Sequence, residues 1–265
     1  MHLLPFLLLI SSVIAAPRPQ NNNNAAALTL DPANVQAASA ATGQEGGDDP
    51  AQADSLTDDA NFINFCTGKT PTNGAQVTGG SCNGIVMGDI PDQGNMVSSL
   101  ITSPTPGEDI AADTSFTVNV KVDGLVAGSF TNPETTYYAA PQALSGGKIV
   151  GHTHVTIQKL SDDSFAVAQP PDAATFVFFK GINDAGDGNG NLAATVDEGL
   201  PAGFYRVCTM TSSSNHQPVL MPVAQRGAQD DCQKFSVGQA GQGQAGGNGG
   251  NGGNGGGNNA NARKA

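Results

Sequence analysis

The sequence is poor in aromatic and basic side chains: it has no tryptophan, three tyrosines, and 11 lysines and arginines against 23 acidic residues. Nucleic acid is therefore not an expected partner, because phosphate binding relies on clustered basic side chains that displace counterions. The scarcity of tryptophan and tyrosine also gives no support for a flat aromatic platform on which sugars stack. The net charge of −12 favours solubility and selects no particular ligand.

Long apolar runs are scarce as well. The run from Leu3 to Ile14 is too short to cross a bilayer, which takes roughly 20 apolar residues. Small Ala15 and Ala16 follow it, and a polar segment begins at Pro17, an order typical of a cleaved signal peptide. The C-terminal residues lack the hydrophobic tail of a glycolipid anchor. We therefore expect residues 1–16 to be a signal peptide and the protein to be secreted, extracellular and without a membrane anchor.

The chain has four cysteines, and an even number in an exported chain predicts disulfide bonds rather than free thiols. Cys66 and Cys82 flank a short polar loop, and Cys208 and Cys232 flank the last core segment, which favours the pairs Cys66–Cys82 and Cys208–Cys232. Pairing between the two ends of the domain remains an alternative. Metal-binding cysteines are not expected, because there is no Cys-x-x-Cys.

Composition divides the chain into a core and two flanks. Residues 17–58 have too few large apolar side chains to offset the entropy of ordering, and we expect a disordered leader there. Residues 238–265 are a Gly/Asn-rich run, which predicts a disordered tail. Residues 59–237 remain as one β-rich domain held by disulfides, a length that fits the usual range of about 100 to 200 residues.

Alternation of apolar and polar residues predicts an all-β domain. In Phe116–Val122 every second residue is apolar, which marks a half-buried strand, and a turn signal follows it. Thr175–Phe179 is apolar on both faces and is expected to be a central strand. Many short strands separated by turns predict an antiparallel β-sandwich or barrel-like domain. The other expected strands are Ile85–Met87, Met96–Ile101, Ile149–Leu160, Leu192–Val196, Phe204–Met210, Val219–Val223 and Lys234–Val237.

Histidines supply the main candidate chemistry. His152 and His154 are two residues apart in an expected strand, so their side chains project from the same face. His216 lies in an expected loop and is a candidate third ligand. Three imidazoles can bind copper or zinc and leave a position open for water or substrate. Paired histidines that only donate hydrogen bonds to the backbone would leave the same sequence pattern.

Other motifs give weaker evidence for a function. Asp187, Asn189 and Asn191 alternate as in a calcium loop, but Leu192 stands where an EF-hand needs glycine for its sharp turn. A hairpin connection built from residues that tolerate positive φ explains the same segment. There is no Gly-x-Ser-x-Gly and no His-Glu-x-x-His, so the sequence identifies no catalytic residue for hydrolysis.

Several motifs in order resemble a family of secreted fungal proteins that often carry the label of ribosomal protein seventeen of the small subunit. The resemblance covers about residues 60–237 and implies a fungal origin and an extracellular location, with no catalytic residue carried over. The ribosomal label does not fit an acidic, exported chain. The motifs are Phe130–Gln142, Gly151–Gln158, Phe178–Asn183, Leu200–Gly203 and Asn215–Val219.

Two functions follow from these observations. The first is a non-enzymatic extracellular or cell-wall-associated protein that contacts cell-wall or host polymer, with its flanks as spacers. The second is a metal-binding module or small metalloenzyme that uses His152, His154 and His216 to hold copper or zinc. Geometry separates them, because metal–nitrogen bonds near 2 Å require the three ring nitrogens to converge within about 3 to 4 Å.

Overall fold

The structure is a computed structural model that describes residues 28–47, 52–161 and 164–239. The chain divides into two compact units, residues 1–67 and 68–265. The expected signal peptide (1–16) and nearly all of the expected tail (238–265) lie outside the described residues. No helix in the described ranges is long and apolar enough to cross a membrane.

The described part of the first unit contains short 3-10 helices joined by polar contacts. They are η2 (Pro32–Asn34) and η3 (Ala37–Ala40). The Asp31 carboxylate caps η2 by accepting from the Ala33 N–H. Ser39 ties η3 to the end of the unit: its hydroxyl donates to the Asp58 carbonyl, and its own carbonyl accepts from the Asp58 N–H.

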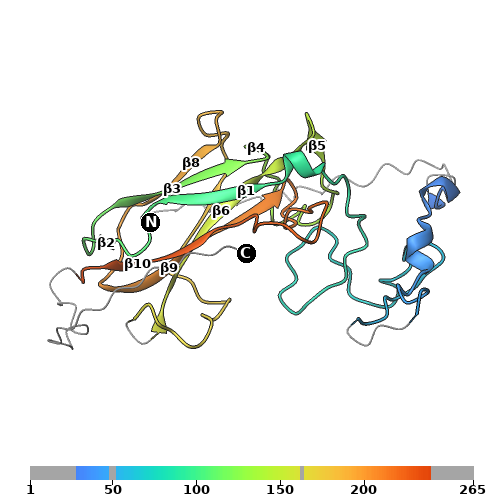
Figure 1. Cartoon of the computed structure of the whole chain (residues 1–265), viewed down its shortest axis with the longest axis horizontal. Coiled ribbons are helices and arrows are strands. Elements are labelled where there is room, and N and C mark those ends of the chain that lie inside the picture. Colours follow the sequence, from blue (N-terminus) through green and yellow to red (C-terminus); the bar gives the residue numbers. More distant parts are fainter. Residues whose placement is uncertain (1–27, 48–51, 162–163, 240–265) are drawn as a thin grey trace, which may run out of the picture. The chain divides into compact units, whose positions relative to one another are not determined.

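The second unit consists of two β-sheets (Figure 1). A 3-10 helix, η4 (Gln93–Asn95), leads into the smaller sheet. That sheet has the order β1-β3-β8, with β1 (Ser98–Ser103), β3 (Phe116–Asp123) and β8 (Asn191–Val196).

The larger sheet has the order β2-β10-β9-β6-β4, and β5 and β7 also pair with β6. Its strands are β2 (Asp109–Ile110), β4 (Leu125–Ala127), β5 (Leu144–Ser145), β6 (Lys148–Lys159), β7 (Phe178–Ile182), β9 (Gly203–Ser213) and β10 (Cys232–Val237). Most pairs are antiparallel, and β4–β6 and β2–β10 are parallel. The long strands β6 and β9 form the centre of this sheet.

Both sheets contribute side chains to one hydrophobic core, so the domain is a β-sandwich and the all-β prediction is confirmed. On β3, Val118, Val120 and Val122 are buried while the polar residues between them are exposed, as the alternation predicted. From the larger sheet, Tyr205 and Phe235 enter the same core and are fully buried. Each such apolar side chain stabilises the fold by roughly 1.5 to 3 kcal/mol.

Three expected strands differ from the structure. Thr175–Phe179 is not a central strand: β7 begins at Phe178, pairs only with β6, and leaves Phe179 exposed. Ile85–Met87 is exposed and Val219–Val223 forms no strand. The physical reason is the same in each case, because apolar and β-branched side chains favour a strand only where a partner strand is available.

A disulfide joins the two strands at the end of the larger sheet. Cys208 and Cys232 face each other in the β9–β10 register, with their Cα atoms 4.1 Å apart. Cys66 and Cys82 are also disulfide-bonded, and none of the four cysteines is a free thiol. The Cys208–Cys232 disulfide connects residues that are 24 positions apart in sequence.

Candidate metal centre

The period of two along β6 places His152 and His154 on one face of the larger sheet. Thr153, Val155 and Ile157 project from the opposite face, and the two apolar ones join the core. In the β6–β9 register, His152 lies opposite Ser212 and His154 opposite Met210. Loops from elsewhere in the chain contact the histidine face, so both imidazoles are buried instead of pointing to solvent.

His216 reaches the same place from the loop that follows β9. Its backbone has a φ of 74°, a region that histidine occupies more readily than most residues. Neighbouring bonds hold this loop: the His216 N–H donates to the Ser213 carbonyl, and the Asn215 side chain donates to the Thr136 carbonyl. The Tyr138 N–H in turn donates to the Asn215 carbonyl, which links the loop to the segment that covers the sheet.

The three histidines converge. Each offers one ligand atom, and these atoms all lie within 4.8 Å of one another. The ring centroid of His152 lies 4.6 Å from that of His154 and 4.9 Å from that of His216. A metal with bonds near 2 Å draws its nitrogens to roughly 3 to 4 Å, so this cluster is somewhat wider than an occupied site and its rings would have to move inward to hold an ion.

Each imidazole is anchored through one nitrogen to a backbone carbonyl. His152 Nδ1 is 3.0 Å from the Ser129 oxygen, His154 Nδ1 is 3.0 Å from the Met210 oxygen, and His216 Nε2 is 2.8 Å from the Thr131 oxygen. A carbonyl oxygen only accepts, so the bonded nitrogen of each neutral ring carries the proton. The opposite nitrogens then hold free lone pairs: Nε2 of His152 and His154, and Nδ1 of His216.

The most informative atom is His152 Nε2. It is buried and has no hydrogen-bond partner among the described residues. Leaving a buried polar atom unpaired costs on the order of 1 to 3 kcal/mol, and native proteins rarely accept that cost without a reason. Here the unpaired atom is an acceptor in a cluster whose three residues each offer one ligand atom within 4.8 Å of the others, an arrangement that a cation would satisfy.

Burial keeps two of these rings in the neutral form, which is the form that binds a metal. Burial, with a smaller contribution from His154, lowers the pKa of His152 from 6.5 to about 4, against the opposing effect of its bond to Ser129. Burial also lowers the pKa of His154. Both imidazoles are therefore neutral at pH 7, as a metal ligand must be.

Aromatic rings surround the cluster. Phe130 lies edge-on to His152 and His216, with centroid distances of 4.8 and 4.9 Å. Tyr137 stacks on His216 at 5.7 Å, and Phe179 lies 5.2 Å from His154. Burial raises the pKa of the Tyr137 hydroxyl to about 12, which keeps it protonated. No carboxylate or thiolate belongs to the cluster in the part of the chain that the structure describes.

Sequence reasoning identified the three histidines but missed the groups that orient and enclose them. The Ser129 and Thr131 carbonyls and the Phe130 ring come from one segment, which no histidine pattern reveals. Part of it lies in the motif Phe130–Gln142, whose sequence shows a family resemblance and no ligand pattern. The carbonyl contacts are backbone interactions, and no sequence signal would have found them.

The acidic loop before β8 connects β7 of the larger sheet to β8 of the smaller sheet, so the expected hairpin connection is wrong: the two strands do not pair with each other. The Asp187 carboxylate accepts from the backbone N–H groups of Asn189 and Asn191 and from the Asn191 amide. These hydrogen bonds, with that from the Asn191 side chain foremost, lower the pKa of Asp187 to about 2. The carboxylate is thus engaged within its own loop, as is common for Asp in turns.

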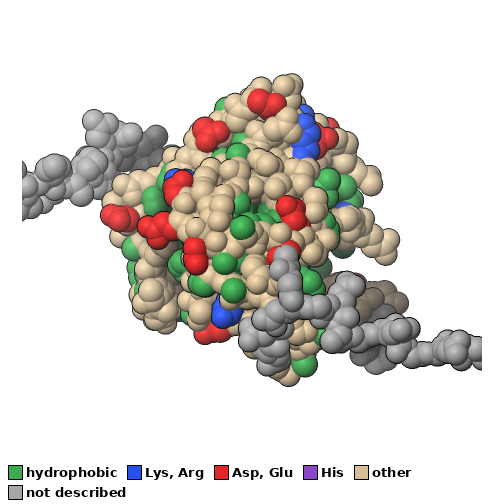
Figure 2. Space-filling view, turned by 90° about the vertical axis from the view of Figure 1, so that its left-hand side faces the viewer, with side chains coloured by type: hydrophobic (Ala, Val, Ile, Leu, Met, Phe, Trp, Pro, Cys, Tyr) green, Lys and Arg blue, Asp and Glu red, His purple; other side chains and the backbone are tan. Residues whose placement is uncertain are grey.

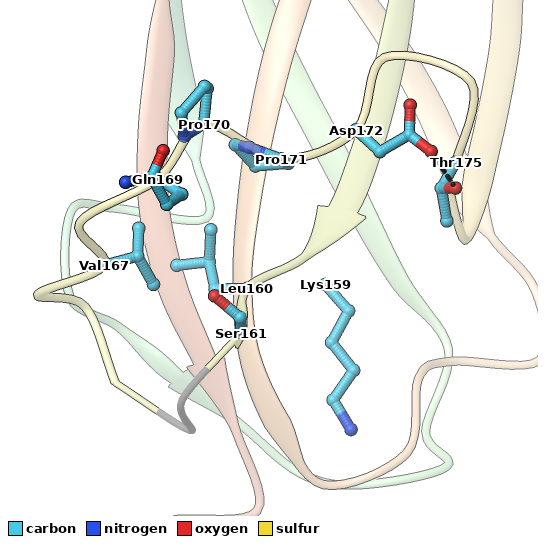
Figure 3. A pocket seen from close by; sticks show the side chains of 9 residues that line it. All are labelled: Lys159, Leu160, Ser161, Val167, Gln169, Pro170, Pro171, Asp172 and Thr175. Atoms are coloured by element: carbon cyan, nitrogen blue, oxygen red, sulfur yellow. Dashed lines mark hydrogen bonds between the residues drawn. The ribbon is translucent and has the colours of Figure 1, made fainter.

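A surface hollow of about 230 Å³ lies away from the histidines, beside the end of β6 (Figure 3). Lys159 lies on one side of it, and on another side the Asp172 carboxylate accepts from the Thr175 hydroxyl. None of the three histidines lines this hollow. The candidate metal centre and the hollow are therefore separate features of the domain.

The fold and the cluster together define a β-sandwich domain with a buried group of three histidines. The family described as the CLU5d N-terminal domain matches residues 99–238, and the chain belongs to this family. This range includes the whole histidine cluster.

A named fungal relative supports the fungal origin that the motifs implied. The chain is 60% identical over 212 residues to "Pathogenicity cluster 5 protein d" of Colletotrichum graminicola (strain M1.001 / M2 / FGSC 10212). The match covers 80% of this chain and 44% of the relative, so this chain spans less than half of the relative's length.

Among solved structures, the fibronectin(III)-like modules of Clostridium thermocellum CbhA match 52% of this chain and 45% of that chain, with 12% identity. The TM-score of 0.25 is too low to support any conclusion.

Proposed function

We propose that this protein is an exported fungal protein whose β-sandwich binds one transition-metal ion through His152, His154 and His216. The observation that carries the proposal is the unpaired, buried His152 Nε2, which lies in a cluster of three converging imidazoles. The carbonyl anchors add support, because metal-binding histidines generally donate their second N–H to a carbonyl or carboxylate that fixes the tautomer. Copper and zinc are the candidate ions, since both accept imidazole.

Burial favours binding over catalysis. The exposed fractions of His152, His154 and His216 are 0%, 9% and 7%. No histidine is visible on the face in Figure 2, where acidic side chains are scattered and basic ones are few. A metal bound by three buried imidazoles is poorly accessible to substrates. The site is therefore better suited to binding an ion than to catalysing a reaction with it.

Export places this binding outside the cell. The N-terminal apolar run is typical of a signal peptide, and disulfides persist in oxidising compartments. The name of the fungal relative connects that protein with a pathogenicity cluster. We therefore place the metal-binding domain at the outer surface of a fungus or in its surroundings, where contact with cell-wall or host polymer is a further expectation.

Metal analysis of the full secreted chain tests the proposal. The protein carries no affinity tag, is stripped with a chelator, and is then exposed separately to zinc and to copper before elemental analysis. We expect one ion per chain. Three variants keep the anchoring donor and remove the ligand nitrogen: His152→Asn and His154→Asn replace Nδ1 with an amide donor, and His216→Gln replaces Nε2. Each should bind less than about a tenth of an equivalent.

Asp187→Asn is the matched control, because it alters the alternative acidic loop and leaves the histidines intact. This variant should retain the full equivalent of metal. Circular dichroism of every variant separates loss of a ligand from loss of the fold. A wild-type protein that stays metal-free, or folded histidine variants that still bind a full equivalent, would refute the proposal.

A further inference from the structure

We infer that the three-histidine site selects monovalent copper over divalent zinc and divalent copper. This inference rests on the proposed function, and it follows from the charge, the surroundings and the number of the ligands.

The ligand set has no charge to offset that of the ion. His152, His154 and His216 each present a neutral lone pair, because the bonded nitrogen of each ring keeps its proton toward a carbonyl. All four cysteines are disulfide-bonded, so none supplies a thiolate. The occupied site would therefore carry the full charge of its ion.

The negative charge of Asp230 does not change this conclusion. Asp230 acts on His154, where its charge opposes the lowering of the pKa. However, Asp230 Oδ1 is already committed to the Thr209 hydroxyl at 3.0 Å and the Thr211 N–H at 2.8 Å. Asp230 is therefore engaged with β9 and is not part of the ligand cluster.

The surroundings penalise a divalent ion more than a monovalent one. The imidazoles are buried and lie against the rings of Phe130, Tyr137 and Phe179. The cost of transferring an ion from water into such a medium rises with the square of its charge, so a dication pays about four times the cost of a monocation of equal size. Neutral ligands in an apolar enclosure thus favour an ion of charge +1.

The number of ligands points to the same ion. Zinc sites in proteins are almost always four-coordinate, so three histidines would need a water or a further donor. Monovalent copper has a filled d shell and is stable with three nitrogen donors in a plane. The cluster of the described residues supplies three donors, which is a complete set for copper(I) and an incomplete one for zinc.

Competition titrations of the stripped, full-length protein test this inference. Copper(I) is titrated under anaerobic conditions against a chromogenic copper(I) chelator, and zinc(II) and copper(II) are titrated against chelators of known affinity. We expect one equivalent of copper(I) with a dissociation constant at least 1,000-fold lower than that for zinc(II), and lower also than that for copper(II). Tighter binding of either divalent ion would overturn the inference and leave the proposed function standing. Binding of none of the three ions would overturn both.

A substitution in the enclosure gives an independent test. Phe130→Glu places a carboxylate beside His152 and His216, and should shift the copper(I)-to-zinc(II) affinity ratio toward zinc by at least tenfold. Phe165→Glu is the control, because Phe165 packs edge-on against Phe204 and has no ring contact with the histidines. The ratio in this control should stay within about twofold of wild type. An equal shift in both variants, or no shift in Phe130→Glu while the protein remains folded, would contradict the role of the apolar enclosure.

Discussion

Acidification should destabilise the metal-free protein through its buried histidines. The pKa of His152 is about 4 in the folded protein against an ordinary value of 6.5, so the unfolded chain takes up the proton first as the pH falls. Stability from this group is therefore complete above pH 6.5 and is lost as the pH falls from there toward 4. Linkage for one group with these two pKa values gives a loss of about 2 kcal/mol between pH 6.5 and 4.5.

Denaturant titrations at half-unit pH steps, with chelator present and circular dichroism as the signal, measure this loss. The comparison is His152→Asn, which keeps a donor for the Ser129 carbonyl and removes the titrating nitrogen. Carboxylates contribute equally to both proteins, so the difference between their slopes isolates the imidazole. The variant should lose about 2 kcal/mol less than wild type over the same range. Identical pH dependence in the two proteins would refute the argument that burial holds His152 neutral.

Three further predictions concern stability. First, a metal added to 100 times its dissociation constant should raise the free energy of unfolding of the wild type, measured by thermal melts, by about 2.7 kcal/mol. The same addition should leave the free energy of unfolding of folded His154→Asn unchanged. Second, replacing Cys208 and Cys232 together with alanine removes a staple across 24 positions and should cost about 3 kcal/mol in denaturant titrations; a change below about 1 kcal/mol would count against it. Third, a methyl group at Gly151 would collide with the Ser212 carbonyl where β6 meets β9, so Gly151→Ala should lower both stability and metal uptake, whereas Gly227→Ala, with open space around it, should change neither.

Local pattern accounts for most of the strands. The alternation in Phe116–Val122 depends only on which side chains favour water, and the structure has β3 over the same residues with one more at its end. The same period placed His152 and His154 on one face before any neighbour was known. Where a strand lies within its sheet is different, because it depends on pairing: Phe178–Ile182 is an edge strand although the segment before and within it is apolar on both faces.

The sequence by itself determined the all-β class, the use of disulfides, and the placement of His152 and His154 on one face, because composition and a two-residue period act over short distances; it named His216 only as a candidate third ligand. Only the tertiary structure decided that His216 joins them, since the antiparallel pairing of β6 with β9 carries the loop after β9 to the histidine face. It also decided the tautomers, which depend on carbonyls of Ser129, Thr131 and Met210 that come from distant segments. Burial of the imidazoles is likewise a property of loops folded over the sheet, and this burial makes the unpaired nitrogen of His152 significant.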